Sequence, residues 1–238
     1  MKKSFIFCVL FLSVGMAKAE EVRLGMLLPL SGKFQELGVD CKKGIEIALE
    51  RNTPIFLEKK IDLKLAYGDS QADPKTGISE FNRLVDREKV QGVVVIRSGV
   101  GMALSQPSKN TKTPILGVVG HKDFTKENEF AFQVWPTSQQ EGEAYADSIM
   151  KQGVKKVAII TTQDDYLSTF SNFLVEKLTK QGVEIVINEQ LAPQDQEVQS
   201  IILKAKLLGA DSIFFNLHPD QLLTALKKKH DLKYSENT

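Results

Sequence analysis

The protein has 238 residues, 42% of them hydrophobic, and its 31 Lys and Arg balance its 30 Asp and Glu to a formal net charge of +1. This balance, broken only by a short basic block at 227–229, excludes the electrostatic footprint of a protein that binds nucleic acid or anionic lipid. With only 8 prolines, the chain is expected to bury a substantial core and to fold as a compact globule.

Residues 1–19 have the layout of a secretory signal peptide. Lys2 and Lys3 precede an apolar run from Phe5 to Met16, and small residues in 17–19 stand directly before Glu20. A helix of about a dozen residues rises roughly 18 Å, short of a hydrocarbon core of about 30 Å, so a membrane anchor is the less favoured interpretation. We predict cleavage between Ala19 and Glu20, and a periplasmic product without a membrane anchor.

The two cysteines offer no disulfide to the mature chain. Cys8 is lost with the leader, and it lies inside the apolar run, where it is poorly placed for lipid attachment to a new N-terminus. Cys41 alone remains, so no intramolecular disulfide can form. The mature length suffices for one large domain or two small ones.

Strands and helices are predicted to alternate through the first half of the chain. Short apolar runs indicate strands, and apolar residues at steps of three and four indicate helices. Asp73 and Pro74 mark a helix start, as an N-cap followed by proline in the first turn. The expected elements are a strand at 22–29, helix 37–50, strand 61–66, helix 76–85, strand 92–96, helix 102–110, and strands 115–119 and 130–135.

The alternation continues in the second half. Ser138 followed three residues later by Glu141 predicts a capping box at the start of a helix over 139–151. Glycines 153, 182 and 209 are expected to end helices as C-caps. The further elements are strand 156–161, helix 169–180, strand 183–188, helix 196–208, strand 212–216 and helix 220–230.

This alternation predicts the α/β class, with parallel sheets covered by helices on both faces. We expect two Rossmann-like lobes, at 20–135 and 136–238, after a signal peptide at 1–19. Ligands of open parallel sheets bind outside the carboxyl ends of the strands, so the loops after each strand are the candidate site.

Those loops are small and polar. Their residues are 30–32, 68–74, 97–101 and 120–123. Backbone N–H groups and hydroxyls in such loops suit an anionic group such as a carboxylate, and hence a small zwitterion. For Asp69 and Asp73 the favoured interpretation is structural, as turn and cap residues, whereas for Ser98 and Gly99 a structural and a binding role both stay open.

Five segments in register resemble the leucine/isoleucine/valine-binding protein family, from about Val22 to the end of the chain. The segments are Leu24–Gly32, Gly68–Pro74, Arg97–Val100, Thr113–Leu116 and Phe132–Gly142. Members are periplasmic substrate-binding components of ABC transporters for branched-chain amino acids. The resemblance implies a two-lobed clamp of the type I periplasmic-binding-protein kind, which closes on a small-molecule ligand and presents it to a membrane permease, with a first crossover at Trp135-Pro136.

The resemblance also implies the ligand contacts. The loops after the third and fourth strands of the first lobe would hold the ligand's carboxylate and ammonium, and the second lobe would add a tyrosine and a contact after its third strand. The implied residues are Ser98, Gly99, Val119, Gly120, Tyr166 and His218, with Arg97 and His121 as further candidates.

Two departures from the family bear on function. Gly120 and His121 stand where members often carry Ser or Thr, so backbone donation would replace a hydroxyl and the ligand's identity is left open. Members also continue past this chain's end, so the second lobe is expected to be incomplete, with an uncovered sheet edge and an unburied apolar helix face.

Three other functions were weighed against solute binding for transport. An exported enzyme is disfavoured, because the chain has no Gly-x-Ser-x-Gly, His-Glu-x-x-His or P-loop motif and no paired cysteines for a metal. We therefore predict no catalysis, no cofactor and no metal. A ligand-sensing domain for a signalling partner, and a truncated remnant without binding, both stay open.

Overall fold

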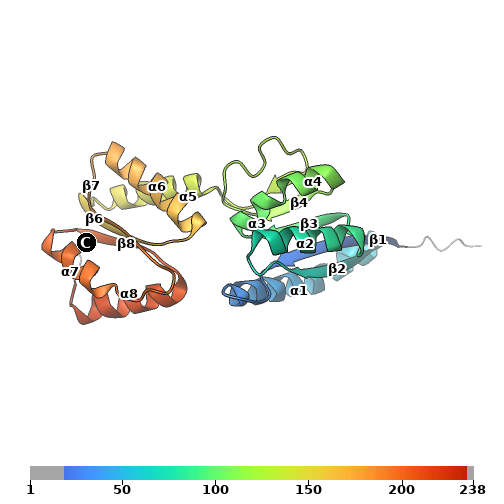
Figure 1. The fold of residues 1–238 in the computed structure, drawn as a ribbon, viewed down its shortest axis with the longest axis horizontal. Helices are drawn as coiled ribbons and strands as arrows, with labels where there is room; N and C mark the ends of the chain where they lie inside the picture. Colours follow the sequence, from blue (N-terminus) through green and yellow to red (C-terminus); the bar gives the residue numbers. More distant parts are fainter. Residues whose placement is uncertain (1–18, 235–238) are drawn as a thin grey trace, which may run out of the picture.

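The computed structural model describes residues 19–234 as two α/β lobes that lie side by side (Figure 1). The predicted leader, up to residue 18, lies outside the described residues, and the first strand begins at Glu20, where the mature chain is predicted to start. Within 19–234, no helix combines the length and apolarity needed to cross a membrane.

The first lobe is built on a five-stranded parallel sheet in the order β2-β1-β3-β4-β5. Its strands are β1 (Glu20–Leu28), β2 (Ile61–Asp69), β3 (Gly92–Ile96), β4 (Ile115–Val118) and β5 (Ala131–Gln133). Its helices are α1 (Gln35–Glu58), α2 (Pro74–Asp86), α3 (Ser98–Ala103) and α4 (Ser105–Thr111).

The second lobe has a three-stranded parallel sheet in the order β7-β6-β8. Its strands are β6 (Lys156–Thr162), β7 (Glu184–Leu191) and β8 (Ser212–Asn216). Its helices are α5 (Ser138–Lys151), α6 (Asp165–Lys180), α7 (Gln199–Leu207) and α8 (Pro219–Asp231). The predicted α/β class with two parallel-sheet lobes is therefore confirmed, as are the three glycine C-caps, which have φ of +76°, +81° and +69°.

Side-chain alternation along the central strands explains why both faces of the first sheet are covered. Val93 and Val95 of β3 pack with Phe81 of α2 on one face. Ile96 points to the opposite face and packs with Ile45 of α1. A strand buried on both sides reads as a continuous apolar run, which is how the sequence presents it.

The second lobe repeats this arrangement around β6. Val157 and Ile159 pack with Leu174 of α6 on one face, whereas Ile160 packs with Ile202 of α7 on the other. Each lobe thus has its own hydrophobic core.

Two helices begin four residues earlier than predicted, and both corrections affect the site. The helix expected over 102–110 is two helices, α3 and α4, and α3 already starts at Ser98. Glycines 99 and 101 indicated a loop, but a Cβ at Gly101 would lie 2.5 Å from Val119, so that glycine serves close packing instead. The helix expected from Thr169 starts at Asp165, because Asp164 is its N-cap.

The predicted capping box was placed one residue too late. Thr137 is the N-cap of α5 and exchanges hydrogen bonds with Gln140. Ser138 is instead the first helical residue, which leaves Glu141 for another contact described below. Helix α1 also runs on past Pro54 to Glu58, since its exposed carboxyl half lets water satisfy the carbonyl that proline cannot bond.

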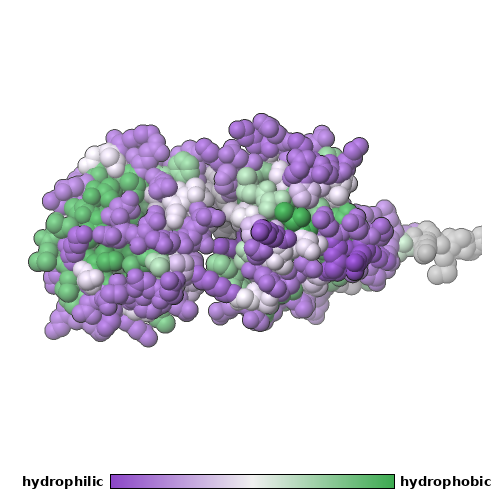
Figure 2. All heavy atoms as spheres, viewed as in Figure 1, coloured by the Kyte–Doolittle hydropathy of each residue, from purple (hydrophilic) through white to green (hydrophobic). Residues whose placement is uncertain are grey.

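The second lobe exposes apolar surface, as predicted. Hydrophobic side chains gather over this lobe in Figure 2, and Leu207 at the end of α7 is 87% exposed. Within the described residues β8 is an edge strand of its sheet.

Candidate functional site

A cavity of about 460 Å³ lies at the carboxyl ends of β3 and β4, between the two lobes. Most of its lining residues are apolar. We call it the apolar cavity; it is lined by Leu37, Cys41, Ile96, Arg97, Ser98, Val118, Gly120, Trp135 and Tyr166. This is the position at which open parallel sheets bind ligands.

A second cavity, of about 430 Å³, shares Ser98 and Tyr166 with the first. Its walls include the opening turns of α3 and α6, and five of its lining residues carry a hydroxyl. We call it the polar cavity; its other lining residues are Gly99, Met102, His121, Ser138, Asp165, Ser168, Thr169 and Asn172.

Ser98 links the two loops of the first lobe that face these cavities. Its hydroxyl accepts a hydrogen bond from the Gly120 N–H at 3.1 Å, and the Gly120 carbonyl in turn accepts from the Ser138 N–H at 2.8 Å. Since a hydroxyl can donate as well as accept, the Ser98 proton can serve a ligand oxygen. The Gly120 N–H, which the sequence offered as a donor, is already engaged.

Tyr166 of α6 closes the apolar cavity from the second lobe. Its hydroxyl contacts the Glu141 carboxylate and accepts from the Trp135 indole N–H at 3.2 Å. Burial raises the pKa of Glu141, and the hydrogen bond from Trp135 opposes that rise. A Cβ at Gly120 would lie 2.2 Å from the Tyr166 ring, so glycine is required for the ring to reach this position.

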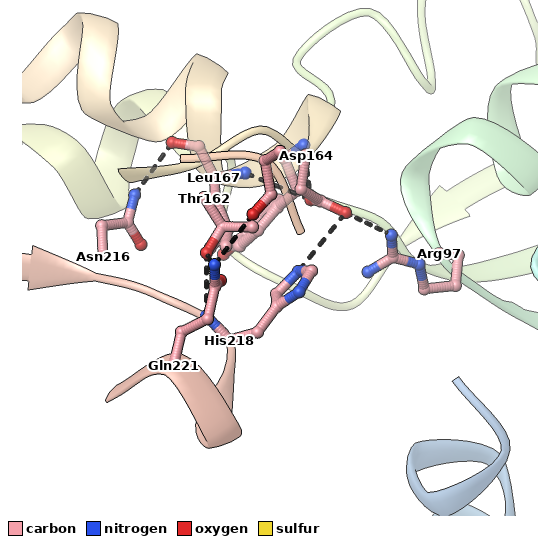
Figure 3. Close-up of polar contacts among 9 residues, drawn as sticks. Arg97, Thr162, Asp164, Leu167, Asn216, His218 and Gln221 are labelled. Atoms are coloured by element: carbon pink, nitrogen blue, oxygen red, sulfur yellow. Dashed lines mark hydrogen bonds and ion pairs between the residues drawn. The ribbon is translucent and has the colours of Figure 1, made fainter. Parts of the chain in front are cut away.

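Arg97 reaches across the cleft to the second lobe, as Figure 3 shows. Its Nη2 lies 2.7 Å from Oδ2 of Asp164, and its guanidinium lies over the Phe34 ring at 4.0 Å from the centroid. Its backbone has φ +89° and ψ 128°, a region that side chains other than glycine rarely adopt. Such strain costs about 1–3 kcal/mol and is retained where surrounding contacts impose it.

His218, which follows β8, lies on the other side of Asp164. Its Nε2 is 3.9 Å from Asp164 Oδ2, and its ring meets the Phe34 ring edge to face at 5.8 Å. Its backbone N–H donates to Thr162 Oγ1 at 3.1 Å. Burial lowers the pKa of His218, aided by Lys33 and Arg97 and opposed by Asp164 and Asp220.

The structural interpretation of Asp69 and Asp73 is confirmed. Asp69 joins the loops after β1 and β2, accepting from the Leu30 N–H at 2.8 Å and the Ser31 hydroxyl at 2.6 Å. Burial acts to raise the pKa of Asp69, but these hydrogen bonds outweigh it and leave the pKa lowered. Asp73 caps α2 by accepting from the Thr76 N–H at 2.8 Å.

A family model described as "Periplasmic binding protein" matches residues 21–236, nearly the whole chain. The chain belongs to the periplasmic binding protein family. The resemblance to leucine/isoleucine/valine-binding proteins is thereby confirmed. The family comprises the periplasmic solute-binding proteins of ABC transporters. These solute-binding proteins are not enzymes.

Relatives of this periplasmic binding protein agree in fold and differ in ligand. The Leu/Ile/Val-binding protein homolog 3 of Brucella melitensis is 26% identical over 208 residues, which cover 85% of this chain and 56% of the relative. LivJ of Streptococcus pneumoniae, in complex with isoleucine, superposes with a TM-score of 0.80 at 18% identity, covering 91% of this chain and 63% of that one. A Rhodopseudomonas palustris solute-binding protein in complex with p-hydroxybenzoic acid gives 0.77 at 20% identity, covering 91% and 60%.

The structure brings only some of the predicted contacts of this periplasmic binding protein together. Ser98, Gly120 and Tyr166 line the apolar cavity, as does Arg97. Gly99 and His121 line the polar cavity instead.

Two predicted contacts lie elsewhere. Val119 is fully buried in the core of the first lobe, and its carbonyl already accepts from Gln133 Nε2 at 2.6 Å, so it is poorly placed to serve a ligand. His218 lies beside Asp164 and Phe34 at the rim.

Sequence reasoning missed three residues of the site. Trp135 was assigned to a strand and crossover, Glu141 to a capping box, and Asp164 to a loop. An aspartate directly after a buried strand and before a helical pattern is an N-cap signal, and it could have found Asp164. Among residues 19–234, no cluster of three or more His, Cys, Asp or Glu side chains could hold a metal ion.

Proposed function

We propose that this protein is an exported solute-binding protein that captures an amino acid or a related small carboxylate between its lobes and delivers it to the permease of an ABC transporter. Export would begin with the leader and cleavage between Ala19 and Glu20. Delivery to a permease rests on family membership alone. This chain spans 56% of the length of the Brucella relative.

The apolar cavity carries the proposal. Aliphatic and aromatic side chains form most of its wall, and the neighbouring residues Arg97 and Ser98 add polar groups. A pocket of this kind suits a ligand that has an apolar body and one carboxylate. Isoleucine and p-hydroxybenzoic acid, the ligands in the two neighbouring structures, both fit that description.

Within this proposal the residues divide by role. Ser98 would receive the carboxylate, Ile96 and Val118 would contact the apolar body, and Gly99 would face the polar cavity. Gly120 would allow Tyr166 to close the cavity from the second lobe. Arg97 and His218 would stand at the rim, and His121 would face the polar cavity.

A melting screen of the purified protein tests the proposal. Branched-chain amino acids, benzoates, amides and short carboxylates would each be added, and ligand at 100 times its Kd would stabilise the fold by about 2.7 kcal/mol. For a chain of this size the melting temperature would rise by about 5–11 °C. No stabilisation by any member of the panel would contradict the proposal.

Two variants would assign the ligand to a cavity. Ser98→Ala removes a hydroxyl from the apolar cavity and should weaken binding about tenfold. Ser168→Ala, a matched change that touches the polar cavity alone, should leave binding unchanged. Weaker binding in both variants would move the site to the polar cavity, which Ser98 also lines.

A further inference from the structure

Four side chains from four separate loops meet at the rim of the cleft. Phe34 and Arg97 come from the first lobe, and Asp164 and His218 come from the second. We call these four residues the rim cluster. Figure 3 shows Arg97 pointing out of the first lobe toward the Asp164 carboxylate.

We propose that Arg97 and Asp164 form a latch that holds the two lobes together at the rim of the cleft. Asp164 is then a positioning residue for closure and does not contact the ligand. The latch does not depend on the proposed function, because both partners belong to the protein.

Asp164 is held rigidly for this task. Its Oδ1 accepts from the Tyr166 and Leu167 N–H groups at 3.0 and 3.3 Å, which caps α6, and this leaves Oδ2 for Arg97. Its side chain is only 8% exposed. A carboxylate withdrawn from water to that extent needs a charged partner, and the guanidinium from the opposite lobe supplies it.

Arg97 is committed to the latch by its backbone and by stacking. The positive φ occurs directly after β3, where the chain leaves the sheet, and the guanidinium lies over the Phe34 ring at 4.0 Å from its centroid. Stacking fixes the plane of the guanidinium and leaves its N–H edge free to bond a carboxylate. Backbone strain at a single residue that reaches across a cleft is the kind of outlier from which a functional role is inferred.

The latch is also sensitive to opening. The other polar contacts between the lobes, Ser138 with Gly120 and Tyr166 with Trp135, lie close to the crossover. The Arg97–Asp164 pair joins loops 67 residues apart at the rim, so a hinge movement would break it. Because a ligand that binds the closed form gains affinity in proportion to the closed population, the latch would also raise ligand affinity.

The test is made on the ligand-free chain with Asp164→Asn. Asparagine keeps the N-cap of α6 but loses the charge. Small-angle scattering would report the radius of gyration. The fluorescence of Trp135, the protein's one tryptophan, would be a second and less sensitive readout, because the contact of its indole with Tyr166 lies close to the crossover.

We expect Asp164→Asn to enlarge the radius of gyration, to shift the Trp135 emission to longer wavelength, and to lower the ratio of closed to open protein about tenfold. Asp73→Asn is the matched control, since Asp73 caps α2 within the first lobe. Arg97→Gln leaves the cap of α6 untouched. If Asp164→Asn fails to melt cooperatively, Arg97→Gln tests whether loss of the ion pair opens the lobes. The double variant should open no further than either single one.

If both single variants had the same radius of gyration and the same Trp135 emission wavelength as the unaltered protein, the latch would be overturned. Because no ligand is present, that outcome is distinct from failure of the proposed function. A latch that opens on substitution in a protein that binds nothing in the melting screen would support the latch and contradict solute capture.

Discussion

The two lobes face the cleft with different chemistry. The first lobe presents strand ends and apolar side chains, such as Ile96, Val118 and Leu37. The second presents polar side chains from the start of one helix and the loop before another, namely Tyr166, Asp164 and His218. In the proposed site the first lobe would supply most of the wall of the apolar cavity, whereas the proposed latch would need one residue from each lobe.

The largest expected effect tests whether the lobes are independent bodies. Phe81 and Leu174 are fully buried in different lobes. Phe81→Ala should destabilise the first lobe by about 3–5 kcal/mol and Leu174→Ala the second by about 2–5 kcal/mol. Hydrogen exchange should show lost protection mainly in the altered lobe, and equal loss in both lobes from either variant would show a single cooperative unit.

A smaller effect should follow from filling the space under Tyr166. The Cβ of Gly120→Ala would lie 2.2 Å from the Tyr166 ring, and overpacking of this kind costs about 1–3 kcal/mol. Because the clash is between lobes, the cost falls on the closed form, and Trp135 emission should shift to longer wavelength. Gly99→Ala is the control, since its Cβ would meet nothing nearer than Pro74 at 4.0 Å. The same Trp135 emission wavelength in both variants would show that Gly120 is not needed for closure.

Tyr166→Phe should have a milder effect. The ring stays, but the hydroxyl that contacts Glu141 and Trp135 is lost, which costs about 1 kcal/mol for each hydrogen bond that water does not replace. Chemical denaturation would measure the loss. An unchanged midpoint would mean that the hydroxyl adds nothing to the joint between the lobes.

The smallest effect is a pH dependence that differs between the lobes. The lowered pKa of His218 means that the unfolded chain binds its proton first, so stability falls as pH drops below about 6.5. Because the pKa of Asp69 is lowered in the folded protein, its carboxylate stabilises the first lobe at pH values above about 3.9. This contribution is lost as the pH falls through the folded pKa. Thermal melts across pH should lose stability in that order, and His218→Gln should remove the first step only. A first step that survives His218→Gln would assign it to another group.

Most of the fold could be predicted from the sequence because its signals are local. Apolar runs and helical periodicity found every strand, and glycine C-caps marked three helix ends. Errors arose where one residue type has two uses. Gly101 was read as a loop former, although its use is close packing against Val119, and only the folded sheet reveals that neighbour.

The site was less predictable because its decisive contacts join distant segments. The positive φ of Arg97 has no signal in the sequence, since a residue other than glycine adopts it only when tertiary contacts impose it. Its pairing with Asp164 depends on the placement of two lobes. Ser98, Gly120 and Tyr166 were identified through family resemblance, and their roles in binding stay predictions.

Calorimetric titration of the purified protein with isoleucine and with 4-hydroxybenzoate tests the central claim most directly. We expect saturable binding of one molecule per chain for at least one of these carboxylates, weakened by Ser98→Ala and unchanged by Ser168→Ala. No heat of binding from either, together with no stabilisation by any other small carboxylate, would contradict capture of a solute between the lobes.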